Sequence, residues 1–180
     1  SAVALLEQAI ENALIIEQQF YNTKYLDDAY FILARSSYMI DRITAANYYF
    51  NKLCQKFPES TFFDESTIWM GYIDLKIGNV DRAKKKLLLL DSVSDKDKFL
   101  LYLLGAEIAK FELNKEDEKK YYLLAIQFTF NDHEKKNLYK KLLLISEDRN
   151  EISDCIIYIN AIEKLSNYDT IDKELIQKWI

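Results

Sequence analysis

The residues that could perform chemistry are few in this sequence, and their spacing does not suit catalysis. His133 is the single histidine, which excludes a catalytic or metal centre built from several histidines. Cys54 and Cys155 lie far apart and form no CxxC pattern, so we expect two buried thiols. The adjacent carboxylates Asp27-Asp28 and Glu116-Asp117-Glu118 point to different sides of a helix, and no nucleophile accompanies them. We therefore expect no catalytic residues, no metal site, no cofactor and no enzymatic activity.

Composition and charge narrow the class of protein further. The formal net charge is −5, and the lysine run Lys84–Lys86 lies among acidic residues, so we expect a solvated face and no nucleic-acid partner. No segment reaches the roughly 20 consecutive apolar residues of a membrane helix, so we expect no transmembrane segment. With 49% hydrophobic residues, 3 glycines and 1 proline, the chain can form long helices around a substantial core.

The stretch with the clearest organisation runs from Leu26 to Ser60. A polar pair, Asp41-Arg42, divides it into two runs in which apolar residues recur at helical spacing. Phe57-Pro58 follows the second run, and a helix cannot easily continue through a proline. The stretch therefore predicts two short helices joined by a tight turn, an αα-hairpin. Its predicted apolar positions are Ala29, Leu33, Tyr38, Ala46, Phe50 and Leu53.

Residue types at fixed intervals in this hairpin resemble the tetratricopeptide (TPR) repeat. Tyr30 stands where that repeat usually has tryptophan, and Ala34 stands where it usually has glycine. The other matching positions are Leu33, Ala46, Phe50 and Pro58. The resemblance implies an all-α fold, a right-handed α-α superhelix that is a TPR-like solenoid of helical hairpins. In such a fold, small residues let the two helices of a hairpin approach closely, and neighbouring hairpins complete the core.

The same pattern recurs along the chain at nearly constant intervals. A shift of 37 residues carries Ala34 to Gly71 and Ala46 to Ala83, and it aligns Val3–Tyr21 with the second helix of the Leu26–Ser60 hairpin. Later units match less well, because Glu118 replaces the packing alanine at a shift of 35. At a further shift of 36, the positions of the small residues carry Leu142 and Asp154.

These repeats predict a single array over residues 1–180. It begins with an unpaired repeat helix at 3–25 and continues with hairpins at 26–62, 63–97, 98–131 and 132–168. A capping helix at 169–180 ends it and covers apolar surface that the last hairpin would otherwise expose. The N-terminal helix lacks its partner, which leaves Leu6, Leu14 and Ile15 partly uncovered. We therefore expect a homodimer through this helix, or a preceding helix that covers it.

The resemblance also predicts a partner-binding groove, because TPR arrays present the first helix of each hairpin to a concave face. The residues on that face are Asp28, Phe31, Arg35, Tyr38, Glu65, Ile68, Tyr72 and Leu75. Apolar and aromatic positions with a few charges suit a bound peptide or helix. An alternative is that Phe31, Ile68 and Leu75 belong to the core between repeats. The lysines and asparagines that hold a chaperone's C-terminal carboxylate in some TPR domains are absent, since Phe31, Arg35 and Trp69 occupy the matching positions.

The function implied is a non-enzymatic scaffold that binds a protein or peptide partner. The runs LDDAYFILARSSY and FPES-x2-FDES resemble bacterial TPR proteins of the cell envelope, nearest to outer-membrane assembly lipoproteins of the BamD type. This resemblance implies a periplasmic or outer-membrane-associated protein acting in envelope assembly, with a cytoplasmic location as the alternative. The competing class is a structural self-association module of a longer chain.

Overall fold

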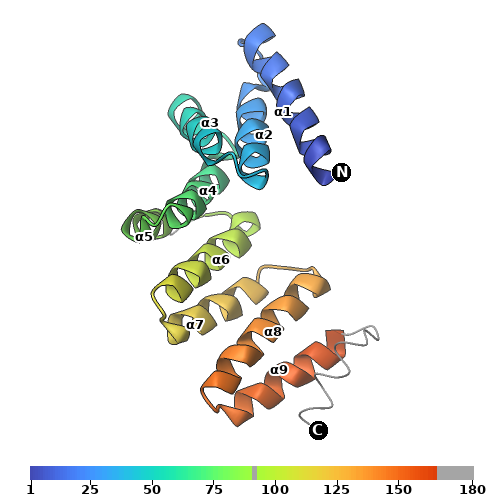
Figure 1. Ribbon diagram of the computed structural model, residues 1–180, viewed down its shortest axis with the longest axis vertical. Coiled ribbons are helices and arrows are strands. Elements are labelled where there is room, and N and C mark those ends of the chain that lie inside the picture. Colours follow the sequence, from blue (N-terminus) through green and yellow to red (C-terminus); the bar gives the residue numbers. More distant parts are fainter. Residues whose placement is uncertain (91–92, 166–180) are drawn as a thin grey trace. The chain divides into compact units, whose positions relative to one another are not determined.

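The computed structural model describes residues 1–90 and 93–165, and throughout this part of the chain the only regular structure is α-helix (Figure 1). The helices fall into two compact units, Ser1–Val93 and Ser94–Ile180. The first unit holds α1 (Ala2–Gln19), α2 (Leu26–Met39), α3 (Ile43–Lys56), α4 (Phe63–Lys76) and α5 (Val80–Leu89). The second holds α6 (Asp95–Phe111), α7 (Lys115–Ile126), α8 (Asp132–Asp148) and α9 (Ile152–Leu165).

This order of elements agrees with the predicted all-α class and with the hairpin predicted over Leu26–Ser60. The single array over 1–180 stays a prediction, because the two units are described separately. The capping helix predicted at 169–180 lies outside the described residues.

Four turns of the same design join the two helices of each hairpin. Each turn has one residue with positive φ, and these residues are Asp41, Gly78, Leu113 and Asn150. The next backbone N–H then donates to a carbonyl five residues earlier, as in the Schellman ending of a helix: for example, Arg42 N to Ser37 O at 2.8 Å and Glu151 N to Ser146 O at 2.9 Å. The turns lie at intervals of 37, 35 and 37 residues, which gives the repeat spacing directly from the backbone.

The core of the first unit forms where small residues let α2 and α3 approach each other. Ala34 and Ala46 are both fully buried. Phe50 is also fully buried, and its ring lies edge-on to Phe31, with the ring centroids 6.2 Å apart. Phe31 in turn stacks on Phe62, which follows α3, at 4.4 Å. The aromatic residue of the repeat thus fills the space between one hairpin and the next, as the repeat pattern predicts.

The turn spacing corrects the sequence alignment of the last hairpin by one residue. The interval between Leu113 and Asn150 is 37 residues, so Leu143 and Cys155 occupy the positions that correspond to Ala106 and Glu118. Leu142 and Leu143 are both buried, but Cys155 is buried whereas Asp154 is partly exposed and pairs with Lys119. The prediction that Leu142 and Asp154 stand in these positions is therefore wrong. A cysteine, which is small, takes the place of the packing alanine.

Candidate partner-binding surface

Three aromatic rings from α2 and α4 form a cluster at the surface of the first unit. The indole of Trp69 lies between two tyrosines, with ring centroids 5.0 Å from Tyr38 and 5.4 Å from Tyr72. All three side chains are partly buried. Trp69 and Tyr72 are one turn apart on α4, so helical spacing brings them together, while Tyr38 reaches them from α2.

Charged groups frame this cluster and fix its central ring. The Trp69 Nε1–H donates to Glu65 Oε1 at 3.2 Å, and Arg35 Nη1 lies 3.7 Å from the same oxygen. The Arg35 guanidinium also lies over the indole, 5.7 Å from the ring centroid. At the other end, Lys76 pairs with Asp41 at 2.6 Å and lies 5.6 Å from the Tyr38 ring. The hydrogen bond to Asp41 raises the pKa of Lys76, which keeps this cation charged.

The structure brings half of the predicted groove residues into this cluster and separates the rest. Arg35, Tyr38, Glu65 and Tyr72 belong to it. Phe31 and Ile68 are only 7% and 0% exposed, so they form core between hairpins and offer a partner almost no surface. The remaining two predicted residues, Asp28 and Leu75, are half-buried outside the contacts described above.

Sequence reasoning used Trp69 only to exclude a carboxylate clamp and missed its central place in the cluster. A signal was present, because Trp69 lies four residues after Glu65 and three before Tyr72, on one face of α4. Sequence reasoning also missed Ile32 and Met39 on α2, which are 41% and 60% exposed. We call Arg35, Tyr38, Glu65, Trp69 and Tyr72 the α2–α4 surface.

A second polar cluster in the first unit has a structural role. Lys52 on α3 forms an ion pair with Glu17 on α1 and lies 4.8 Å and 5.2 Å from the ring centroids of Tyr30 and Tyr48. Tyr49 also donates to Glu17, at 3.1 Å. Burial, together with the negative charge of Glu17, raises the pKa of Tyr49 to about 12. These contacts are largely shielded from solvent and join α1, α2 and α3.

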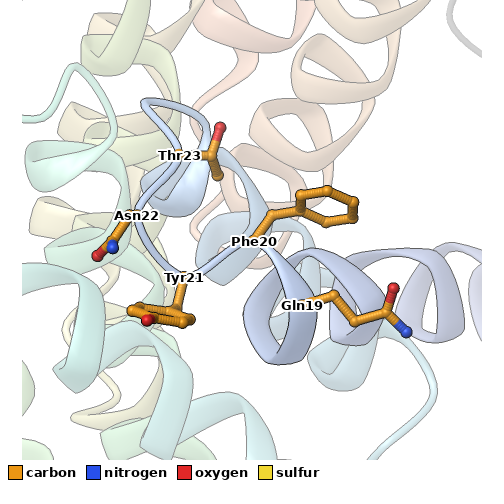
Figure 2. Close-up of a pocket in the computed structure, with 5 residues that line it drawn as sticks. All are labelled: Gln19, Phe20, Tyr21, Asn22 and Thr23. Carbon is orange, nitrogen blue, oxygen red and sulfur yellow. The ribbon is translucent and has the colours of Figure 1, made fainter.

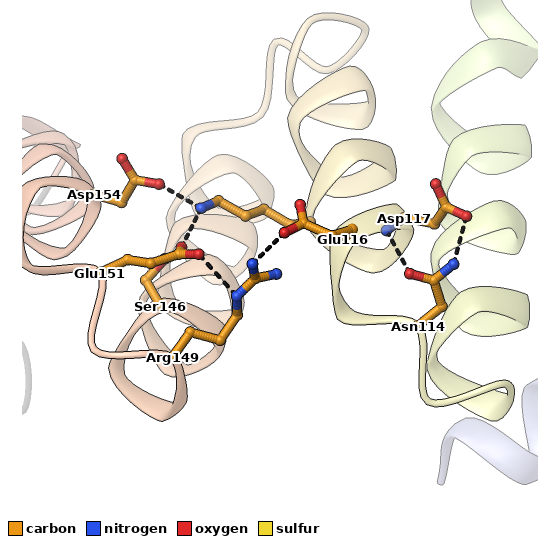
Figure 3. Close-up of polar contacts among 8 residues, drawn as sticks. Asn114, Glu116, Asp117, Ser146, Arg149, Glu151 and Asp154 are labelled. Atoms are coloured by element: carbon orange, nitrogen blue, oxygen red, sulfur yellow. Dashed lines mark hydrogen bonds and ion pairs between the residues drawn. The ribbon is translucent and has the colours of Figure 1, made fainter.

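The second unit contains a polar network that joins α7 to α8 and α9 (Figure 3). Lys119 on α7 pairs with both Glu151 and Asp154. Arg149 pairs with Glu116 and, at 2.8 Å, with Glu151, which also accepts a hydrogen bond from Ser146 at 3.3 Å. The hydrogen bond from Lys119 lowers the pKa of Glu151. Because each carboxylate already has a cationic partner, this network holds the helices together and presents no unpaired acid or base.

The rest of the described chain has few of the features that a metal site, a membrane helix, a reactive thiol or a ligand pocket would require. In residues 1–90 and 93–165, no three His, Cys, Asp or Glu side chains gather as a metal ion would require. Within the same residues, no helix has the length and apolar character needed to cross a membrane. Cys155 is buried and Cys54 is half-buried, both as free thiols, and burial raises the pKa of each. An open hollow of about 330 Å³ adjoins residues 19–23, at the end of α1 and in the turn that follows it (Figure 2).

Comparisons with known proteins give similarity in fold. No family model matches the sequence, and no curated protein matches it significantly. The Cut9–Hcn1 hetero-tetramer of the APC/C has a chain that matches 97% of this one with a TM-score of 0.71 and 12% identity. PilF of Pseudomonas aeruginosa matches 99% with a TM-score of 0.65 and 10% identity, and MamA matches 87% with a TM-score of 0.59 and 15% identity.

The three similar chains are TPR-repeat proteins, so the chain has the predicted all-α fold of TPR-like solenoids. It covers 33% of the Cut9–Hcn1 chain, 82% of MamA and 90% of PilF. The finer resemblance to lipoproteins of the BamD type stays a prediction.

Proposed function

We propose that this protein is a non-enzymatic scaffold that binds a segment of a partner protein on the α2–α4 surface. The observation that carries the proposal is the placement of Trp69, which is partly exposed, lies between two tyrosines and has its indole N–H bonded to Glu65. Tryptophan, tyrosine and arginine are the residue types that most often dominate binding energy at protein interfaces.

The arrangement of these side chains favours binding because they are already ordered. Each ring contacts another ring, and Arg35 is placed by both Glu65 and Trp69. Ordering a side chain on binding typically costs about 0.5–1.5 kcal/mol, so a surface that is ordered beforehand avoids much of this cost. The rings can therefore accept an apolar or aromatic group of the partner with little rearrangement.

The charges of the α2–α4 surface indicate what else the partner should carry. The Arg35 side chain is 49% exposed, and the one ion pair that it forms within the described residues, with Glu65 at 3.7 Å, is longer than a hydrogen bond. A guanidinium has five N–H donors, so Arg35 retains donors for a carboxylate on the partner. We infer a partner segment with an apolar or aromatic residue next to an acidic one. The acid would set the register of binding more than its strength.

Similarity in fold supports a role in protein binding and leaves the partner open. One of the similar chains comes from a hetero-tetramer of Cut9 with Hcn1, so a chain of this fold is assembled there with another protein. A place in bacterial envelope assembly rests on the sequence resemblance at LDDAYFILARSSY and FPES-x2-FDES alone. A signal peptide or a lipidated cysteine in the full reading frame would support that location.

The test compares partner capture and thermal melting for matched variants. We expect Trp69→Ala to lose native partners, because truncating such an anchor often costs about 2 kcal/mol or more of binding energy. Arg35→Glu should lower capture as well. Arg42→Glu is the control, because Arg42 is similarly exposed and also pairs with a glutamate, Glu7, which lies on α1 and outside the α2–α4 surface. If Trp69→Ala and Arg35→Glu retain every partner that the unaltered protein captures, the proposal is wrong.

A further inference from the structure

The turn between α1 and α2 has the same local structure as the turn between α3 and α4. In the first turn, Thr23 N donates to Phe20 O at 2.9 Å, and in the second, Ser60 N donates to Phe57 O at 3.0 Å. The hydroxyl groups of Thr23 and Ser60 both accept from the backbone N–H two residues later, at 3.4 Å and 3.2 Å. α1 therefore ends as α3 does, 37 residues earlier in the chain.

What lies on the later turn shows what the earlier one could bind. Helix α2 packs there through Tyr30, whose ring centroid is 6.0 Å from that of Phe57 and 5.8 Å from Lys56 Nζ. Ser60 donates to Asp27, also on α2, at 2.7 Å. The end of α3 and its turn thus hold an aromatic residue and an acidic residue of one helix.

The corresponding positions on α1 and its turn form the open hollow of about 330 Å³ (Figure 2). Gln19, Phe20 and Thr23 correspond to Lys56, Phe57 and Ser60, and Figure 2 shows Gln19 and Phe20 reaching to the same side of the turn. Phe20 is 57% exposed, and Ile15, which corresponds to Lys52, is 46% exposed. The hollow is at the small end of the range typical for ligand pockets, roughly 300–1,000 Å³.

The exposed side of α2 corresponds in the same way, 37 residues earlier, to the side of α4 that contacts α2. From α4, Trp69 and Lys76 reach back to Tyr38 on α2, and Glu65 pairs with Arg35. Their counterparts on α2 are Ile32, Met39 and Asp28. Ile32 and Met39 are 41% and 60% exposed, and within the described residues Asp28 has no ion pair.

We propose that this face, formed by Ile15, Phe20, Thr23, Asp28, Ile32 and Met39, binds an amphipathic α-helix of a partner protein. The helix would lie against α1 and α2 as α2 lies against α3 and α4. Its chemistry follows from the residues that α2 uses there, an acid, two aromatics and a cation with the spacing of Asp27, Tyr30, Arg35 and Tyr38. The first aromatic enters the hollow, the cation pairs with Asp28, and the second aromatic covers Ile32 and Met39.

A partner protein supplies this helix more readily than a second copy of the chain does. Every helix of the described part of the chain already belongs to one of the two packed units. In a second copy, the helix with the required pattern is α2 itself, which would have to leave its place against α3. The face adjoins the α2–α4 surface on α2, where Arg35 lies between Ile32 and Met39 along the helix. Its other residues lie on α1 and its turn, and none lies on α4.

The test uses a labelled peptide with the sequence of residues 25–42, which carries the required pattern, and measures its binding to the intact chain by fluorescence anisotropy. We expect saturable binding, with a Kd about tenfold or more higher for the Y30A peptide. Ile15→Asp in the chain should weaken binding to a similar degree. Ile157→Asp on α9 is the matched control, because Ile157 is an exposed isoleucine of the second unit.

Exchanging the charges of Asp28 in the chain and Arg35 in the peptide distinguishes a peptide that binds this face from one that displaces α2. Asp28→Lys should weaken binding of the unaltered peptide about threefold, as for an exposed ion pair, and the R35E peptide should restore it. Binding that is absent up to about 1 mM peptide, or unchanged by both Y30A and Ile15→Asp, would overturn the proposal. A dimer in sedimentation that Ile15→Asp dissociates would also overturn it, because a second copy would then be the occupant. Melting curves verify that each variant is folded.

Discussion

Replacing Gly105 by alanine tests a close approach between α6 and α7 in the second unit. A Cβ atom on Gly105 would lie 2.6 Å from Cδ1 and Cε1 of Tyr121 and 2.9 Å from its Cγ. Real Cβ contacts are essentially never shorter than 3.0 Å. Because Cγ is the root of the ring, rotation of the ring about its own axis cannot relieve the contact. Either the Tyr121 side chain must leave its rotamer or α7 must move away from α6.

Two opposing effects determine how much Gly105→Ala changes the free energy of unfolding. Overpacking of this kind typically costs about 1–3 kcal/mol. Alanine is favoured over glycine in a helix interior by about 1 kcal/mol, which offsets part of that cost. We therefore expect Gly105→Ala to lower the free energy of unfolding by about 0–2 kcal/mol. A loss of 1 kcal/mol corresponds to a decrease in Tm of about 2–4 °C for a chain of this length.

A more decisive test is whether the effect of Gly105→Ala on stability reverses when Tyr121 is also replaced. In a Tyr121→Ala variant the obstructing ring is gone, so Gly105→Ala should stabilise the protein by about 1 kcal/mol through helix propensity alone. The double-mutant cycle should then give a coupling of about 1–3 kcal/mol, measured by urea denaturation followed by circular dichroism. Stabilisation by Gly105→Ala in the unaltered protein, with no coupling to Tyr121, would refute the reasoning.

Two further predictions concern the first unit. Phe50→Ala should lower the free energy of unfolding by about 3–5 kcal/mol, because it leaves a cavity beside Phe31, and an unchanged Tm would contradict this. The pKa of Tyr49 is about 12 in the folded protein and about 10 when unfolded, so its contribution to stability is present below pH 10 and is lost as pH rises through 12. Urea denaturation between pH 9 and 11.5 should therefore show falling stability, with a shallower slope in Tyr49→Phe.

The hairpin over Leu26–Ser60 could be predicted from sequence because its signals are local. The polar pair Asp41-Arg42 became the turn, and Asp41 takes the positive φ that ends α2. The last hairpin was placed one residue off because α8 has a leucine run and no glycine or alanine to mark its register. The useful signal there was Asn150, since asparagine, after glycine, is the residue most often found with positive φ at the end of a helix.

The candidate surface was only partly predictable for a different reason. Residues on the first helix of a hairpin alternate between solvent and the helix of the next hairpin, and the sequence repeat does not distinguish them. Phe31 is covered because Phe62, in the turn after α3, stacks on it. Arg35, four residues later on the same helix, stays exposed over Trp69. That difference depends on a tertiary contact of the turn, which the spacing within α2 does not contain.

Glu118 and Gly105 together explain how the third hairpin tolerates a departure from the repeat. Glu118 occupies the position of the packing alanine and is buried, but its carboxylate pairs with Lys115 at 3.0 Å and accepts a hydrogen bond from Tyr122 at 3.4 Å. A buried carboxylate with these partners is far less costly than an unpaired one. The close approach is supplied instead by the first helix, where Gly105 makes room for the ring of Tyr121. The first helix of this hairpin therefore has two adjacent small residues, Gly105 and Ala106, and a search for alanine at the position of Glu118 could not find the close approach.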